Sequence, residues 1–167
     1  MKAGIAAAVG ALGLAMSSFA NADWTTIIQD DIFSGGNTAV LVGPISQQQS
    51  VAFDCDSDGL SLALLQKDKW SETRVSSTWN LLIKIDAGEV YRFTAASRKR
   101  NDQYVQYITQ DKDEILKVLA DLRGAKSKIL LGIQSAELDS KWSGTASVAG
   151  STKATNEFIQ ACKLKVD

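Results

Sequence analysis

The 167-residue sequence contains no histidine. This absence excludes catalytic triads and dyads built on histidine, histidine acid–base catalysis and the usual catalytic zinc sites. The sequence also lacks a G-x-S-x-G elbow, a phosphate-binding G-x-x-x-x-G-K-[ST] loop and a C-x-x-C pair. We therefore expect a protein that is not an enzyme, with no catalytic residue and no cofactor.

Strong charge of either sign is also missing. The formal net charge is −1 at pH 7, whereas nucleic-acid binding requires a basic surface. After the first 22 residues, no hydrophobic stretch is long enough to cross a bilayer. The sequence thus predicts neither nucleic-acid binding nor a membrane span.

The N-terminus carries an export signal. Residues 1–22 begin with a single charge at Lys2, continue with an apolar run over residues 5–16, and end in the small-x-small site Ala20-Asn21-Ala22. This pattern predicts a secretory signal peptide. We expect the mature protein to begin at Asp23, to form a single β-rich domain over residues 23–167, and to reside in the bacterial periplasm or the medium.

Cysteine is scarce, with Cys55 and Cys162 as the only two. An oxidising compartment favours a disulfide, and two cysteines allow one intramolecular bond, Cys55–Cys162. Such a bond would stabilise a C-terminal element that would otherwise fray. The alternative is a pair of free, buried thiols that behave as small apolar side chains.

Most of the chain shows the pattern of short β-strands. In residues 51–55, alternation places Val51, Phe53 and Cys55 on one face. The strands that we expect lie at residues 24–29, 38–42, 51–55, 60–66, 79–85, 90–95, 104–109, 128–134 and 141–150. Many short strands separated by turn residues are typical of all-β folds.

Two segments show helical spacing. Asp111 can cap the first helix, Glu114 follows three residues later, and Gly124 can end it. The second helix is expected over about residues 152–163, with Phe158 and Cys162 on one face. The expected fold is an antiparallel β-sandwich or barrel with two short helices, one of them C-terminal and joined to a strand by the disulfide.

Three carboxylates alternate in the segment Asp54-Cys55-Asp56-Ser57-Asp58-Gly59. Asp54, Asp56 and Asp58 resemble the first half of a calcium-binding loop. The position for the bidentate Glu holds Leu65, and strands flank the loop. The segment therefore favours an acidic hairpin turn over a metal site.

Two other features are candidates for a contact surface. The first is the basic run Arg98-Lys99-Arg100, which could dock an acidic partner or could simply be a solvated loop. The second is Trp70, which follows a strand end and could be exposed. The other tryptophans, Trp24, Trp79 and Trp142, are expected to be core or incidental packing rather than a ligand platform.

The order of elements resembles a known type of protein. A Trp follows the cleavage site, a strand ends at Cys55, and further matching segments follow at residues 83–90, 119–122, 129–133, 144–151 and 158–162. This order resembles the small periplasmic proteins of the invasion-associated locus B type and similar accessory proteins of type VI secretion clusters. The resemblance covers most of the mature chain. It implies a non-enzymatic envelope protein with a β-sandwich and a Cys55–Cys162 bond, and it carries over no catalytic residues.

Three functions remain open at this point. The first is a periplasmic binding or accessory protein that acts through protein contacts, in secretion or envelope assembly. The second is an inhibitor or immunity protein against a cell-wall hydrolase or a toxin, since loops on a stable frame can supply its contact surface. The third, a hydrolase that uses a carboxylate pair, is least favoured because no pattern marks such a pair.

Overall fold

A computed structural model describes residues 23–32, 35–69 and 77–166. The expected signal peptide, residues 1–22, and Trp70 lie outside the described residues. The described strands are β1 (Thr25–Asp31), β2 (Gly36–Pro44), β3 (Gln49–Asp56), β4 (Gly59–Lys67), β5 (Trp79–Ile85), β6 (Val90–Lys99), β7 (Tyr104–Thr109), β8 (Ile129–Ser135) and β9 (Ser140–Ala146). The helices are α1 (Lys112–Arg123) and α2 (Ser151–Ala161).

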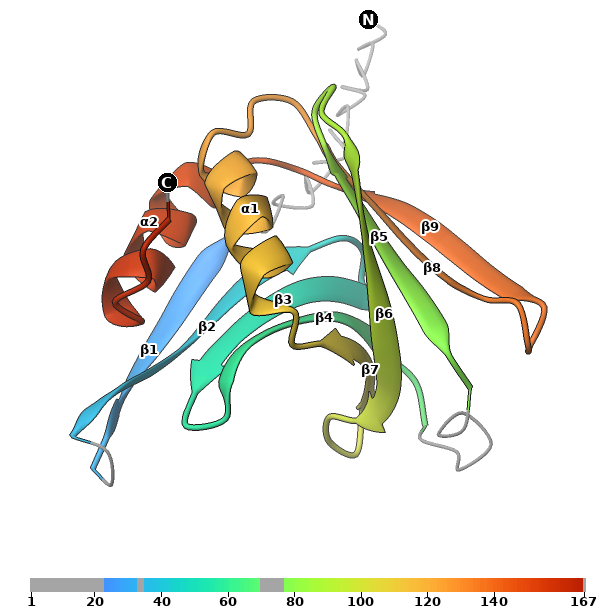
Figure 1. Cartoon of the computed structure of the whole chain (residues 1–167), viewed down its shortest axis with the longest axis horizontal. Coiled ribbons are helices and arrows are strands. Elements are labelled where there is room, and N and C mark those ends of the chain that lie inside the picture. The colour runs from blue at the N-terminus through green and yellow to red at the C-terminus, as the bar shows by residue number, and fades with distance from the viewer. Residues whose placement is uncertain (1–22, 33–34, 70–76, 167) are drawn as a thin grey trace, which may run out of the picture.

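The strands form a nine-stranded antiparallel sheet in the order β1-β2-β3-β4-β7-β6-β5-β8-β9. Its two halves meet at β6, which pairs with β5 through residues 90–95 and with β7 through residues 96–99. Figure 1 shows β1–β4 as one arched half, and β5, β8 and β9 as the other. The mainly β fold with two short helices is thus confirmed.

The core lies between the two halves and the helices. Alternate residues of the central strands face it, because side chains in a strand point to opposite faces in turn. The rings of Phe53 and Phe158 lie 6.4 Å apart between β3 and α2, and those of Trp79 and Tyr107 lie 4.6 Å apart between β5 and β7. Aromatic pairs at such distances add to the free energy gained from burial.

Helix α1 follows the expected local rules. The Asp111 side chain accepts a hydrogen bond from the backbone N–H of Glu114, and Gly124 follows the last turn. The buried stripe consists of Ile115, Val118, Leu119 and Leu122. The expected N-cap, stop and core face of this helix are therefore confirmed.

Helix α2 is joined to the sheet by the predicted disulfide. Cys162, the residue after α2, is bonded to Cys55 near the end of β3, across 107 positions of sequence. The Thr26 hydroxyl of β1 also donates to the Ala154 carbonyl of α2, at 2.6 Å. The disulfide and these contacts hold α2 against β1 and β2.

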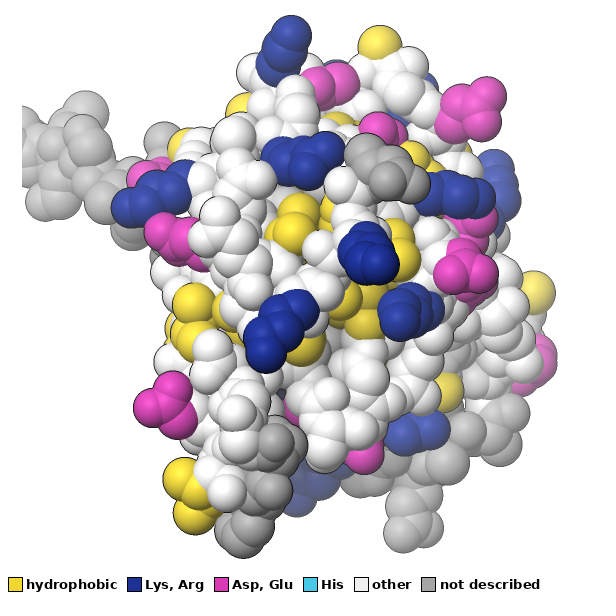
Figure 2. Space-filling model, turned by 60° about the vertical axis from the view of Figure 1, so that its left-hand side comes forward, with side chains coloured by type: hydrophobic (Ala, Val, Ile, Leu, Met, Phe, Trp, Pro, Cys, Tyr) yellow, Lys and Arg dark blue, Asp and Glu magenta, His cyan; other side chains and the backbone are white. Residues whose placement is uncertain are grey.

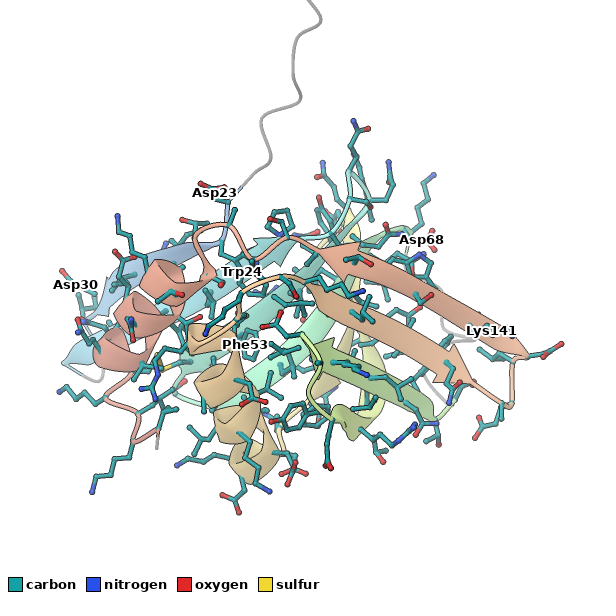
Figure 3. The ribbon with its side chains drawn as sticks, turned by 90° about the horizontal axis from the view of Figure 1, so that it is seen from above. Asp23, Trp24, Asp30, Phe53, Asp68 and Lys141 are labelled. Carbon is teal, nitrogen blue, oxygen red and sulfur yellow. A yellow bond between two sulfur atoms is a disulfide. The ribbon has the colours of Figure 1, made fainter. Side chains whose placement is uncertain are left out.

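Trp24 ties the beginning of β1 to the chain that follows β9. Its backbone N–H donates to the Ala149 carbonyl at 3.0 Å, and its indole N–H donates to the Ser147 carbonyl at 2.7 Å. A Cβ at Gly43 would lie 2.3 Å from the Trp24 ring. Glycine therefore lets the indole lie directly against the backbone of β2. Figure 3 shows Trp24 and Phe53 between the two halves of the sheet.

An ion pair joins distant parts of the sheet on the face opposite the core. Arg100, in the β6–β7 turn, donates from Nη1 and Nη2 to the two carboxylate oxygens of Asp54 at 2.7 and 2.6 Å. Arg100 also donates to Gln106 Oε1 at 3.1 Å. In the strand register, Asp54 pairs with Ser61 of β4, whereas Gln106 pairs with Leu65, which lies further along the same strand. The arching of the strands brings these two levels within reach of one side chain.

Two element boundaries differ from expectation. Strand β6 continues to Lys99, so Arg98 and Lys99 belong to a strand rather than to a loop. The strand expected over residues 141–150 ends at Ala146, because the chain then turns towards α2 at Gly150, whose φ is +77°. The first boundary is set by pairing of residues 96–99 with β7, the next strand in the chain, and the second by the turn before α2.

Asp86 fastens the β5–β6 turn to the segment between α1 and β8. Its carboxylate accepts hydrogen bonds from the backbone N–H groups of Lys126, Ser127 and Lys128, and from the Ser127 hydroxyl. The Ser127 hydroxyl bond, followed by the three backbone bonds, holds the pKa of Asp86 well below its usual value.

We expect Asp86→Asn to lower the melting temperature at neutral pH, because an amide cannot accept the same set of bonds. A lowered pKa contributes stability that is complete above about pH 4 to 5 and is lost as pH falls below the ordinary value of about 3.9. The difference between wild type and D86N should therefore shrink from pH 5 to pH 2 in thermal melts. Glu89→Gln, an exposed change in the same turn, is the control, and a pH-independent difference would contradict the assignment.

Among the described residues, neither helix is long and apolar enough to cross a membrane.

Candidate functional site

Half of the exposed large hydrophobic side chains among the described residues lie together at one end of the sheet. Ile27, Ile28 and Ile32 are 53%, 46% and 85% exposed, and all lie in β1 or directly after it. The other exposed large hydrophobic residues among those described are Val90, Leu130 and Leu138, which lie on other elements. A concentration of exposed apolar side chains indicates an interaction surface, whereas single ones are ordinary. We call residues 25–32 the β1 edge.

The β1 edge is held in place by pairing with β2 and by hydrogen bonds to neighbouring segments. Strand β1 pairs with β2 over all of its seven residues, with Ile27 opposite Val40 and Ile28 opposite Ala39. Ile27 and Ile28 therefore lie on opposite faces of the sheet. The Trp24 bonds hold the start of the strand, and the Thr26 bond joins it to α2. Figure 3 shows Asp30 at the outer end of this strand, and α2 on one side of it.

The side of the molecule that carries α2 has a different character. Figure 2 shows Lys and Arg side chains around a small hydrophobic area on this side. Residues 111–128 and 151–166 together contain eight Lys and Arg against five Asp and Glu. Apolar side chains after the buried stripe of α2, such as Ile159 and Leu164, are only partly exposed. This face is basic, and its hydrophobic residues contribute to packing.

The basic run Arg98-Lys99-Arg100 does not form one surface. Arg100 is bound to Asp54, and Lys99 pairs with Asp102 at 2.6 Å. Successive residues of a strand face opposite ways, so Arg98 and Lys99 point to different sides of β6. Hydrogen bonding to Asp54 raises the pKa of Arg100 further above its usual value. Arg100 therefore stabilises the fold, and a partner could not reach all three cations at once.

Arg98 borders a shallow pocket of about 400 Å³. The pocket lies where β6 passes from one half of the sheet to the other, and it is lined by polar groups that include Ser77, Thr94, Thr109 and Gln110. Small-molecule sites are usually enclosed and mostly apolar, with only a few polar groups. This open and polar pocket lacks that character.

Two of the three carboxylates of the β3–β4 hairpin, those of Asp54 and Asp56, form hydrogen bonds within the fold. Asp54 binds Arg100, and the Asp56 carboxylate accepts the backbone N–H of Asp58 at 2.8 Å. Gly59 has a φ of +110°, as the tight turn requires. Within the described ranges, no three Asp, Glu or Cys side chains gather as a metal ion would need.

Two tryptophans lie in the core as expected. Trp24 and Trp79 are 5% and 3% exposed, and Trp142 of β9 is half-buried. Trp24 and Trp79 therefore present no open ring face for a ligand, and the Trp142 ring lies against Gly144, where a Cβ would come within 2.6 Å of it.

Sequence patterns alone did not single out the β1 edge. The signal was present, since the adjacent pair Ile27-Ile28 breaks the alternation of a strand with one buried face. Two adjacent isoleucines also suit a central strand buried on both faces. Only the strand order shows that β1 lies at the edge.

No model of a known protein family matches this chain, and no curated protein sequence matches it. Among solved structures, the chain is similar to invasion associated protein B from Bartonella henselae, with a TM-score of 0.48 and 12% sequence identity over 86% of this chain and 97% of that chain. This protein is of the type that the order of sequence elements resembles. At this identity and TM-score, the similarity carries no argument about what the present chain binds.

Proposed function

We propose that this protein is a non-enzymatic accessory protein of the bacterial periplasm that acts by binding another protein through the β1 edge. The observation that carries the proposal is the exposure of Ile27, Ile28 and Ile32 at one edge of a sheet whose core is otherwise enclosed. Exposed apolar residues on a firm support favour association with a partner, because their burial releases ordered water.

The location in the periplasm rests on two further features. The expected signal peptide at residues 1–22 would export the chain. The Cys55–Cys162 disulfide is compatible with an oxidising compartment. The chain contains no histidine, a common group in acid–base catalysis, and its fold is held by a disulfide and by hydrogen bonds between distant segments. These properties favour a binding role over acid–base catalysis.

Site-specific cross-linking in cells tests this function. A photoreactive amino acid at Ile27 should give a discrete adduct on irradiation, because that side chain is 53% exposed at the proposed interface. The matched position is Leu130, which is 36% exposed on β8, inside the sheet. We expect the adduct at position 27 only, and Ile28→Lys should abolish it.

The mass of the captured partner distinguishes the roles that the sequence leaves open. A secretion or envelope component supports the accessory role. A cell-wall hydrolase or toxin supports binding through β1, but replaces the accessory role with inhibition. Identical adducts from positions 27 and 130, or no adduct at either, would overturn the proposed function.

A further inference from the structure

The free side of β1 offers unpaired backbone groups to a partner. Among the residues that the structure describes, β1 pairs with β2 and no strand lies on its other side. In an edge strand, every second residue turns its N–H and C=O away from the sheet, where they can accept another strand. Figure 1 shows β1 at the outer limit of the arched half of the sheet.

The two edge strands of this sheet differ in the features that prevent pairing with a further strand. Strands β1 and β9 both have seven residues. The exposed positions of β9 hold Ser140, Lys141, Ser143 and Thr145, and none of its residues is an exposed large hydrophobic. Strand β1 contains no Lys and no Pro, and exposes Ile27 and Ile28. Proteins usually protect an edge strand with charge, proline or a bulge. The charges of β1, Asp30 and Asp31, lie at its end, so its centre at Ile27 and Ile28 is left open, whereas β9 presents Lys141 and polar residues.

The side chains of β1 can contact an added strand on both faces of the sheet. Ile27 lies on the face of Val40, and Ile28 on the face of Ala39 and α2. An added strand places neighbouring side chains about 4.5–5.5 Å from those of the edge. Apolar residues at adjacent positions of the partner would therefore cover Ile27 on one face and Ile28 on the other.

Charge determines which strand fits. Residues 23–32 contain Asp23, Asp30 and Asp31, and no Lys or Arg. In antiparallel self-pairing with Ile27 opposite Ile27, Asp31 of one copy would lie directly opposite Asp23 of the second. Like charges across strands are destabilising, so a second copy fits poorly. A partner with basic residues beside its apolar centre would be attracted to both ends.

We infer that the partner binds by strand addition, contributing an extended segment with an apolar centre and flanking Lys or Arg residues. This inference rests on the proposed function and specifies its chemistry. Backbone hydrogen bonds to β1 supply the general affinity, and the isoleucines with the flanking aspartates supply the selectivity.

Short peptides test the inference directly. The first probe is the capped peptide Lys-Lys-Thr-Val-Val-Val-Thr-Lys-Lys, the second has Glu in place of every Lys, and the third is the Lys peptide with N-methyl groups on its three adjacent valines, which block both of its edges. Amide shifts and hydrogen exchange of the mature protein are followed by NMR. We expect the Lys peptide to protect β1 amides, the Glu peptide to bind at least about tenfold more weakly, and N-methylation to remove binding.

Two variants locate the binding. Ile28→Lys places a positive charge on the edge strand and should abolish the protection of β1 amides by the Lys peptide. Leu130→Lys makes the same change on an inner strand and should leave that protection intact. Affinity for the Lys peptide should also fall as salt is added. Both positions are exposed, so unchanged melting temperatures are expected and confirm that the variants fold.

The outcomes separate this inference from the proposed function. Protection confined to β1 supports strand addition. No change in β1 at millimolar Lys peptide, or equal binding of the N-methylated peptide, overturns it. If the cross-link at position 27 still forms in cells, the function stands and only the binding mode fails. If the peptide binds β1 but no adduct forms in cells, the function fails instead.

Discussion

Replacing both cysteines by serine should lower the free energy of unfolding by about 3–4 kcal/mol. The Cys55–Cys162 bond closes a loop of 107 positions. Without it, the unfolded chain gains conformations, while the folded state keeps its other contacts. Natural domains have a stability of about 5–15 kcal/mol, so the loss is a large part of the total.

The loss should be centred on α2. This helix has no side-chain cap at its N-terminus. Without the disulfide, the helix is still held by packing against α1, β1 and β2, by the Phe53–Phe158 contact with β3, and by the Thr26 bond. We expect amide exchange in α2 and residues 162–166 to increase more than exchange in β3 and β4.

Urea unfolding followed by tryptophan fluorescence measures the effect, because Trp24 and Trp79 are buried in the folded state. The wild type should lose a similar amount of stability in dithiothreitol. The double serine variant is the control, since reductant should leave it unchanged. Equal unfolding midpoints for oxidised and reduced wild type would contradict a stabilising role.

Arg100→Ala should cost about 2–3 kcal/mol, less than the value of about 3–5 kcal/mol for a fully buried pair. The side chains of Arg100 and Asp54 are 27% and 12% exposed, so water screens the pair only in part. Removing Arg100 leaves the Asp54 carboxylate largely buried and without its bidentate partner. The unpaired charge accounts for most of the expected loss.

A double-mutant cycle separates the pair from its surroundings. Asp54→Asn alone should also destabilise the protein, and R100A/D54N should be more stable than the sum of the two losses predicts. Lys99→Ala is the matched control, because its ion pair with Asp102 is exposed, and should change stability little. Additive losses in the cycle would contradict direct coupling between Arg100 and Asp54.

Local sequence rules were sufficient for most of the elements. The alternation at Val51, Phe53 and Cys55 identified the core face of β3, and Asp111 with Gly124 set the limits of α1. These features depend on residues near one another in the chain, so their chemistry is visible in the sequence. The disulfide was predictable for a different reason, since two cysteines allow one intramolecular bond.

The role of the basic run could not be predicted in the same way. Arg98, Lys99 and Arg100 are adjacent in sequence, yet Arg98 borders an open pocket, Lys99 pairs with Asp102, and Arg100 binds Asp54. The partner of Arg100 is 46 residues away. Only the arching of the sheet brings it near, and no local pattern encodes that curvature.

The sequence by itself determined the strands and helices, their buried faces and the disulfide, because hydrophobic periodicity, capping residues and cysteine number are local or countable properties. Tertiary structure alone decided the strand order, which places β7 beside β4 and leaves β1 at an edge. Alternation specifies which face of a strand is buried but not which strand lies beside it. The exposure of Ile27 and Ile28, and with it the proposed binding surface, follows from that long-range pairing.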